Sequence, residues 1–81
     1  MIEIGTFHHV RLQYDEAWLY CACLYENGYN DWRMPDWQEY IDNVKYNPFV
    51  RKAMDENNNI APWDLTDSDQ FSRPIVPVRT K

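Results

Sequence analysis

The sequence predicts an α+β fold in which two to three short helices pack on a small antiparallel sheet. Segments of β-type composition lie near both ends of the chain, and helical segments lie between them. This order of strands, helices and strands is typical of α+β domains. The sheet is therefore expected to join the N- and C-terminal strands. With 81 residues the chain is expected to form a single domain, 1–81.

The first twelve residues predict two short strands, 2–4 and 7–12, with a turn or bulge between them. Val10 and Leu12 alternate with polar residues, which is the period of a half-buried strand. One face of the second strand is therefore expected to lie on the core.

A first helix is predicted from an N-cap at Asp15 to about Tyr25. From Ala17 onward it is apolar on every side, so it is either buried all round or presents one face to a partner. A domain this small buries only about 60% of the surface of its unfolded chain, so full burial is hard to arrange. We therefore expect a contact with another molecule through Tyr20, Cys23 and Tyr25.

The segment after this helix predicts a tight helix–loop–helix corner. Gly28 suits the left-handed position past a helix C-terminus. Asp36 and Glu39 have the spacing of a capping box at the start of the next helix. The corner itself is expected to be a structural element built from Trp32, Arg33 and Trp37. The arginine is expected to stack on indole rings, a contact worth roughly 0.5–2 kcal/mol.

Two further helices are predicted. One runs from Trp37 to about Val44 and places apolar residues on one face, at positions 37, 40, 41 and 44. Pro48 opens the other, because proline suits the first turn of a helix. The inward residues of this helix are expected to be Phe49, Val50, Ala53 and Met54, and the outward ones Arg51 and Lys52.

The remainder of the chain predicts a turn and two strands. Residues 57–59 are asparagines, which tolerate left-handed backbone angles and favour a turn. The segments 60–65 and 74–79 have strand composition. Pro74 and Pro77 cannot donate to a strand ladder, so the last strand is expected to lie at an edge or to carry a bulge.

The most distinctive motif of the chain lies at 20–41. It contains a Tyr-Cys pair at 20 and 21, the run Gly-Tyr-Asn-Asp-Trp-Arg-Met-Pro at 28–35, and Glu-Tyr-Ile at 39–41. This pattern resembles the Lcl C-terminal domain family, a C-type-lectin-like domain common in bacterial surface proteins and phage-encoded proteins.

Two later segments, 61–66 and 72–79, are similar to later strands of the same family, although the chain lacks most of the family's strands between the second helix and the end. The resemblance implies a C-type-lectin-like fold and a function in binding. It also implies that the Trp32-Arg33 pair is an element of the core and corner, without a part in catalysis.

Composition excludes several classes of function. The net charge of −5 argues against nucleic-acid binding, which needs lysine and arginine to displace counterions. No apolar run is long enough for a membrane span, and no secretory signal is visible. Cys21 and Cys23 would point to different sides of a helix and cannot bridge each other. We therefore expect reduced thiols and a cytoplasmic location, in a host cell if the chain is phage-encoded.

The segment 55–69 carries five acidic residues and no basic one. The acidic residues are Asp55, Glu56, Asp64, Asp67 and Asp69. They either only keep the chain soluble or form a patch that binds a basic partner. The segment lacks the glycine and the terminal glutamate of a calcium loop.

No metal, cofactor or catalytic group is expected. His8, His9, Cys21 and Cys23 offer ligand atoms, but neither pair has the spacing that is usual in zinc sites. Nothing near the cysteines marks a lowered thiol pKa of the kind that a nucleophile needs.

Thirteen of the 81 residues are aromatic, more than a small core hides, so some are expected in a groove or an interface. We expect a non-enzymatic, phage-type accessory protein that binds and modulates a host protein, for example by inhibiting a defence factor or an enzyme. Two alternatives stay open. One is an oligomeric protein that sequesters a nucleotide- or sugar-like ligand, and the other is a structural component of a virion or a surface fibre.

Overall fold

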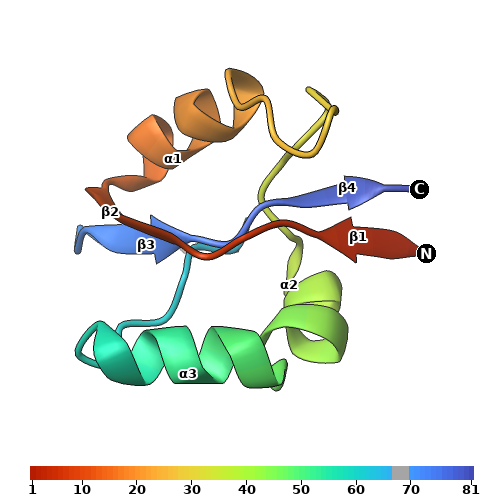
Figure 1. The fold of residues 1–81 in the computed structure, drawn as a ribbon. Helices are drawn as coiled ribbons and strands as arrows, with labels where there is room; N and C mark the ends of the chain where they lie inside the picture. The colour runs from red at the N-terminus through yellow and green to blue at the C-terminus, as the bar shows by residue number, and fades with distance from the viewer. Residues whose placement is uncertain (67–69) are drawn as a thin grey trace.

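Figure 1 shows the computed structural model, which describes residues 1–66 and 70–81. The fold is α+β, with three short helices and two small antiparallel sheets. The strands are β1 (Ile2–Ile4), β2 (His8–Leu12), β3 (Arg73–Ile75) and β4 (Val78–Thr80). The helices are α1 (Tyr14–Ala22), α2 (Trp37–Glu39) and α3 (Pro48–Glu56), and a π-helical turn, η1 (Tyr40–Val44), continues α2.

The N- and C-terminal strands pair as predicted, but in two sheets instead of one. β1 pairs with β4 and β2 with β3, both antiparallel. The two sheets follow each other along one ribbon (Figure 1), which is interrupted between β3 and β4 at Pro77. Proline has no N–H for the ladder. One bond crosses the interruption, from the Gly5 N–H to the Pro77 carbonyl at 2.8 Å.

The ribbon separates two hydrophobic clusters, because side chains alternate between its faces. Ile75 packs on the side of α1, in a cluster with Ala17, Cys21, Met34 and Trp63. Val76 and Val78 face the other side, in a cluster with Tyr40, Val44 and Val50. α1 therefore covers one face of the ribbon, and α2 and α3 cover the other (Figure 1).

The prediction for the first helix was wrong at both ends. Its N-cap is Gln13, whose N–H donates to the Glu16 carboxylate at 2.8 Å. Asp15 is the second residue of the helix, in its first turn, where its charge suits the positive end of the helix dipole. The helix ends at Ala22 instead of Tyr25.

Gly28 has the left-handed conformation expected of it, but it does not end a helix. Asn27 and Gly28 both have positive φ, 55° and 82°, and Glu26 and Tyr29 exchange two backbone hydrogen bonds of 3.0 Å across them. This is the arrangement of a two-residue type I′ turn, for which Asn-Gly is the favoured sequence. The indole N–H of Trp32 binds the carbonyls of both flanking residues.

The capping box of the second helix is confirmed. The Glu39 N–H donates to the Asp36 carboxylate at 2.8 Å, and the Asp36 N–H donates to the Glu39 carboxylate at 3.0 Å. The apolar stripe is only partly correct. After one turn the helix widens to η1, which places Tyr40 and Val44 in the core and leaves Trp37 about half exposed.

α3 begins at Pro48 as predicted, with the Asn47 side chain accepting from the first free N–H groups. Val50 is buried, and Arg51 and Lys52 point outward. Phe49 was expected in the core and is 83% exposed. It follows Pro48 in the first turn, where it lines a hollow between the helix and the ribbon instead of filling the core. The turn after α3 is confirmed by positive φ at residues 58 and 59.

The segment 60–65 is not the predicted strand. It is irregular, and it is anchored by single bonds from the Trp63 N–H to the Pro74 carbonyl and from the Leu65 N–H to the Pro35 carbonyl. The indole of Trp63 is fully buried and donates to the Leu12 carbonyl at 2.7 Å. Within the described part of the chain, no helix combines the length and the apolar character needed to cross a membrane.

Candidate functional site

The outer face of α1 is the best candidate for a functional surface. Ala17 and Cys21 point to the core and are buried. The opposite side of the helix carries Trp18, Leu19, Ala22 and Cys23, all exposed. Leu19 is 67% exposed and Trp18 47% exposed. A helix that is apolar on both sides and covered on only one has an outer side suited to a partner.

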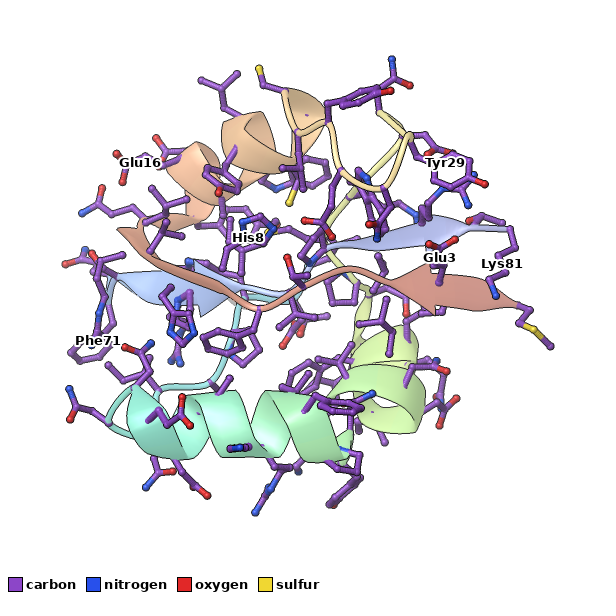
Figure 2. All side chains as sticks on the ribbon, viewed as in Figure 1. Glu3, His8, Glu16, Tyr29, Phe71 and Lys81 are labelled. Carbon is purple, nitrogen blue, oxygen red and sulfur yellow. The ribbon has the colours of Figure 1, made fainter. Side chains whose placement is uncertain are left out.

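Acidic side chains border this apolar face. Asp15 and Glu16 lie three or four residues before Leu19, so all three are neighbours on the helix surface. Figure 2 shows Glu16 at the outer edge of α1, away from the ribbon. We call the exposed residues Asp15, Glu16, Trp18, Leu19, Ala22 and Cys23 the α1 surface.

A hydrogen-bonded chain attaches α1 to the ribbon. His8 points from β2 towards α1 (Figure 2), and its Nδ1 lies 2.8 Å from the Tyr20 hydroxyl. Its Nε2 lies 2.8 Å from Glu26 Oε1. Thr6 donates to the same carboxylate through its N–H, at 2.8 Å, and its hydroxyl, at 2.9 Å. This network joins β2, α1 and the type I′ turn, so it fixes the orientation of the α1 surface.

Burial alone would raise the pKa of Glu26, but the hydrogen bonds from Thr6 and His8 outweigh it and hold this pKa below its ordinary value of 4.5. Glu26 therefore works as a charged acceptor that holds three segments together.

The residues expected to form the contact on the first helix fall in two groups. Cys23 and Tyr25 are exposed, as a contact requires. Tyr20 was expected to face outward and instead faces inward, because its hydroxyl binds His8 and its ring packs edge-on to the imidazole at 5.3 Å. The pattern pointed to a helix that has an exposed apolar side, but it did not identify Trp18 and Leu19 as the residues on that side. Their position on the helix, away from Ala17 and Cys21, was the signal that could have identified them.

The two cysteines are free thiols in different environments. Burial raises the pKa of the Cys21 thiol to about 12, so this group is an inert part of the core. Cys23 lies on the α1 surface.

The contacts in the corner differ from the prediction. Trp32 is buried as expected. Arg33 lies over none of the rings that the structure describes, and instead forms a two-pronged pair with Glu39 at 2.6 and 2.7 Å. The ring of Trp37 stacks on Tyr40. The hydrogen bond from Arg33 holds the pKa of Glu39 below its ordinary value, against the opposing effect of burial.

The acidic segment 55–69 is not one patch. Asp55 and Glu56 are exposed in the last turn of α3, whereas Asp64 is buried and its carboxylate accepts from the N–H and the hydroxyl of Thr66. Asp64 is therefore a turn residue of the core edge and no part of a surface. The predictions for Asp67 and Asp69 fall outside the described residues.

Sequence reasoning missed Arg79 on β4. Its guanidinium lies 3.6 Å from the centre of the Tyr29 ring and binds Asp31 at 2.8 Å and Glu3 at 2.9 Å. Figure 2 shows Glu3 and Tyr29 near each other at the end of the ribbon where the two chain termini lie. Because Glu3 pairs with Arg79 across the two strands, the ion pair could have been inferred once the terminal strands were paired.

The helical layer on the opposite side of the ribbon carries charges of both signs. Residues 12–32, which include α1, hold four acidic residues and no basic one, whereas residues 43–54 hold three basic residues and no acidic one. Arg51 and Lys52 are exposed and form no ion pair within the described part of the chain. The whole layer of residues 36–56 carries five acidic and three basic residues, so it is not basic overall.

Two of the hollows in the described surface lie along the ribbon. One of about 360 Å³ lies between the interruption of the ribbon and the start of α3, lined by Ile4, Gly5, Thr6, Phe7, Asn47, Phe49 and Val50. The other, of about 530 Å³, lies at the far end of the ribbon, near Phe71 (Figure 2). Its lining includes Arg11, Ile60, Phe71, Ser72 and Arg73.

No three His, Cys, Asp or Glu side chains among residues 1–66 and 70–81 lie close enough together to hold a metal ion. We found no match to this chain among protein-family models, curated proteins or solved structures. The resemblance at 20–41 therefore stays a prediction.

Proposed function

We propose that this chain is a non-enzymatic binding protein that contacts another protein through the α1 surface. The observation that carries the proposal is the exposure of Trp18 and Leu19 on a helix whose other side is fully used by the core. Tryptophan is enriched among the residues that dominate protein interfaces, and an apolar centre inside a polar rim is typical of such surfaces. The rim formed by Asp15 and Glu16 favours a basic partner.

The proposed biological setting is that of a phage-type accessory protein acting on a host protein in the host cytoplasm, with a C-type-lectin-like fold. The motif at 28–35 supports this setting through its resemblance to the Lcl C-terminal domain family. Helices that flank a ribbon made of the two terminal strands are compatible with such a fold.

The proposal can be tested by affinity capture from a lysate of the host bacterium, with mass spectrometry of the captured proteins. The bait is compared with a Leu19→Ser variant and with a Tyr46→Ser control, which removes an equally exposed apolar side chain outside the α1 surface. We expect a partner that the wild type and the control retain and that Leu19→Ser loses at least tenfold. Equal capture by all three baits, or no specific capture, contradicts the proposal.

A second candidate function rests on the 530 Å³ hollow. Its volume lies in the range of small-molecule sites, about 300–1,000 Å³. It combines the exposed Arg11 with the ring of Phe71, which suits an anion that carries a flat ring, such as a nucleotide. This hollow lies within one chain, whereas the sequence suggested a groove between subunits.

Calorimetric titration with AMP, on the wild type and on Arg11→Gln, tests this candidate. Saturable heat with the wild type that falls at least tenfold in affinity in the variant supports it. No heat with the wild type, or equal affinity for the variant, contradicts it.

A further inference from the structure

Strand β1 has a neighbouring strand on one side only. β4 pairs with it along one edge, and no strand of the described chain lies along the other edge (Figure 1). The Gly5 N–H binds the Pro77 carbonyl on the paired side, whereas Val78, the partner of Ile4, forms its backbone bonds on the side away from β1. Residues of an antiparallel pair bond alternately inward and outward. The N–H and C=O groups of Ile2 and Ile4 therefore point outward, without a partner among the described residues, and we call these groups the β1 edge.

The 360 Å³ hollow lies beside this edge. Ile4 belongs to both features, because its side chain lines the hollow and its backbone faces the open side of β1. The other walls carry no charge, and they include Phe7 from the ribbon and Asn47, Phe49 and Val50 from the start of α3. The volume falls in the range of ligand sites, about 300–1,000 Å³, and apolar walls beside a few polar groups are typical of such sites.

An extended peptide matches both features. A strand that adds to the β1 edge exchanges hydrogen bonds with Ile2 and with Ile4, as in other proteins that bind peptides by strand addition. Side chains directly opposite each other lie on the same face of a sheet. The side chain of Ile4 faces the cluster under α3, so the ligand residue opposite it points to the same side and reaches the hollow. The backbone thus fixes the position of the ligand, and the hollow selects an apolar side chain.

Glu3 determines which strand can bind. Its carboxylate accepts one hydrogen bond, from Arg79, which also binds Asp31. Lys81, at the same end of the ribbon (Figure 2), forms no ion pair with any residue that the structure describes. If a second copy joined its own β1 edge to this one, the two Glu3 side chains would lie directly opposite each other, which is destabilising. A strand with lysine or arginine at this place gives the carboxylate a second cation instead.

We propose that the β1 edge and the 360 Å³ hollow bind an extended segment of a partner protein. The segment runs antiparallel to β1, the direction with the slightly more stable pairing. It places a large apolar residue opposite Ile4 and a basic residue opposite Glu3. This site goes beyond the proposed function, since the hollow lies on the α3 side of the ribbon, away from the α1 surface.

The test titrates the isotope-labelled protein with the peptide acetyl-Thr-Val-Phe-Lys-Val-Thr-amide and follows the backbone amides by NMR. In the antiparallel arrangement the phenylalanine lies opposite Ile4, the lysine opposite Glu3 and the second valine opposite Ile2. We expect saturable shifts centred on the amides of Ile2, Ile4 and Phe49. Hydrogen exchange of the Ile2 and Ile4 amides should also slow at least tenfold at saturation, because the peptide carbonyls accept from them.

Two N-methylated peptides isolate the backbone bonds. Methylation of the phenylalanine nitrogen removes the donor to the Ile4 carbonyl and should weaken binding at least tenfold. Methylation of the lysine nitrogen is the matched control, because that N–H points away from β1, and affinity should stay within threefold. A peptide with glutamate in place of its lysine should bind at least threefold more weakly, and the loss should shrink in the Glu3→Gln variant.

Protein variants complete the test. Phe49→Ser should weaken binding at least threefold, whereas Tyr46→Ser, an exposed position outside the hollow, should not. The absence of saturable shifts at millimolar peptide overturns the inference, as does equal weakening by the two methylated peptides. Shifts of the β1 amides with protein concentration alone would mean that a second copy holds the edge, and they also overturn it. Leu19→Ser should bind the peptide like the wild type, so failure of this site and failure of the α1 surface are separate results.

Discussion

Gly5 is the residue at which the ribbon depends most on the absence of a side chain. A Cβ at this position would lie 2.8 Å from Pro77 Cγ, 2.6 Å from Glu26 Oε2 and 3.2 Å from the Trp32 ring. The proline ring is tied to the backbone and cannot move aside. The close approach lets the Gly5 N–H reach the Pro77 carbonyl, which is the bond that links the two sheets.

We predict that Gly5→Ala lowers the free energy of unfolding. Overpacking of this kind costs about 1–3 kcal/mol, which exceeds the gain of about 0.4–1 kcal/mol from a stiffer unfolded chain. Urea denaturation measures the difference. Gly28→Asn is the matched control, because asparagine tolerates the positive φ there and nothing lies within 4 Å of a Cβ at this site. A Gly5→Ala protein as stable as the wild type would show that the ribbon can shift to admit a methyl group.

Glu26 gives the second prediction at the scale of single residues. Its pKa is lower in the folded protein than its ordinary value of 4.5, so its charged form stabilises the fold. The stabilisation is fully present above pH 4.5 and is lost as the pH falls through the lower folded pKa. Glu26→Gln should therefore melt below the wild type at pH 6, and the gap should shrink as the pH falls from 4.5 to 3.

The control for this prediction is Glu56→Gln, which changes an exposed carboxylate that forms no ion pair within the described chain. A gap between Glu26→Gln and the wild type that stays constant from pH 6 to pH 3 would contradict the role of the Glu26 charge. His8 and Tyr20 also face this network. The comparison runs from pH 6 to pH 3, the range in which carboxylates change their charge.

At the scale of elements, the charges in the last turn of α3 oppose the dipole of the helix. Asp55 and Glu56 lie in the last turn, where the helix dipole is negative, and no basic residue lies there. Carboxylates in this place destabilise a helix, whereas lysine would stabilise it. A cost of this kind without a folding benefit is consistent with a role in binding, because functional surfaces often reduce stability.

We predict that Glu56→Lys raises the free energy of unfolding by about 0.3–1 kcal/mol at low salt. The effect should fall as salt screens the charges. Glu16→Lys is the opposite control, because it removes a favourable charge and a cap from the first turn of α1 and should destabilise the protein. If Glu56→Lys is less stable than the wild type, the carboxylate has a stabilising role that its exposure does not suggest.

The elements also show which features could be predicted from the sequence. The capping box of Asp36 and Glu39 and the start of α3 at Pro48 were predicted correctly, because a few neighbouring residues determine them. Gly28 was misassigned because positive φ serves a helix end and a type I′ turn equally well, and the decisive residue was Asn27. Local rules of this kind predict the backbone conformation of a residue better than they predict whether that residue lies at a helix end or in a turn.

Tertiary features were less accessible. Asp64 looked like part of a solvated segment, but it is buried, as are its neighbours Pro62 and Trp63. Arg33 has aromatic neighbours in sequence, but a carboxylate six residues away offers a stronger two-pronged bond. The candidate site also depended on tertiary packing. The apolar helix was visible in the sequence, and the side that stays exposed depended on which side met Ile75.

At the scale of the whole molecule, the two hydrophobic clusters share one ribbon. Ile75 belongs to the cluster under α1, and Val76, the next residue, belongs to the cluster under α3. Neither helical layer can keep its cluster if the ribbon opens, since the same backbone carries both. We therefore expect the chain to unfold in one cooperative step, as small domains usually do.

The last prediction tests this coupling with a substitution on one side and a probe on the other. Val44 is fully buried among the residues packed under α2 and α3, so Val44→Ala should cost about 2 kcal/mol. If the layers are coupled, the amides of α1 exchange through global unfolding of the chain. Their free energy of protection against exchange should therefore fall in the variant by about the same 2 kcal/mol. Urea transitions followed by far-UV circular dichroism and by tryptophan fluorescence should also coincide in both proteins. Unchanged protection of α1 in the variant, with two separate transitions, would instead mean that each layer holds its own half of the ribbon and unfolds alone.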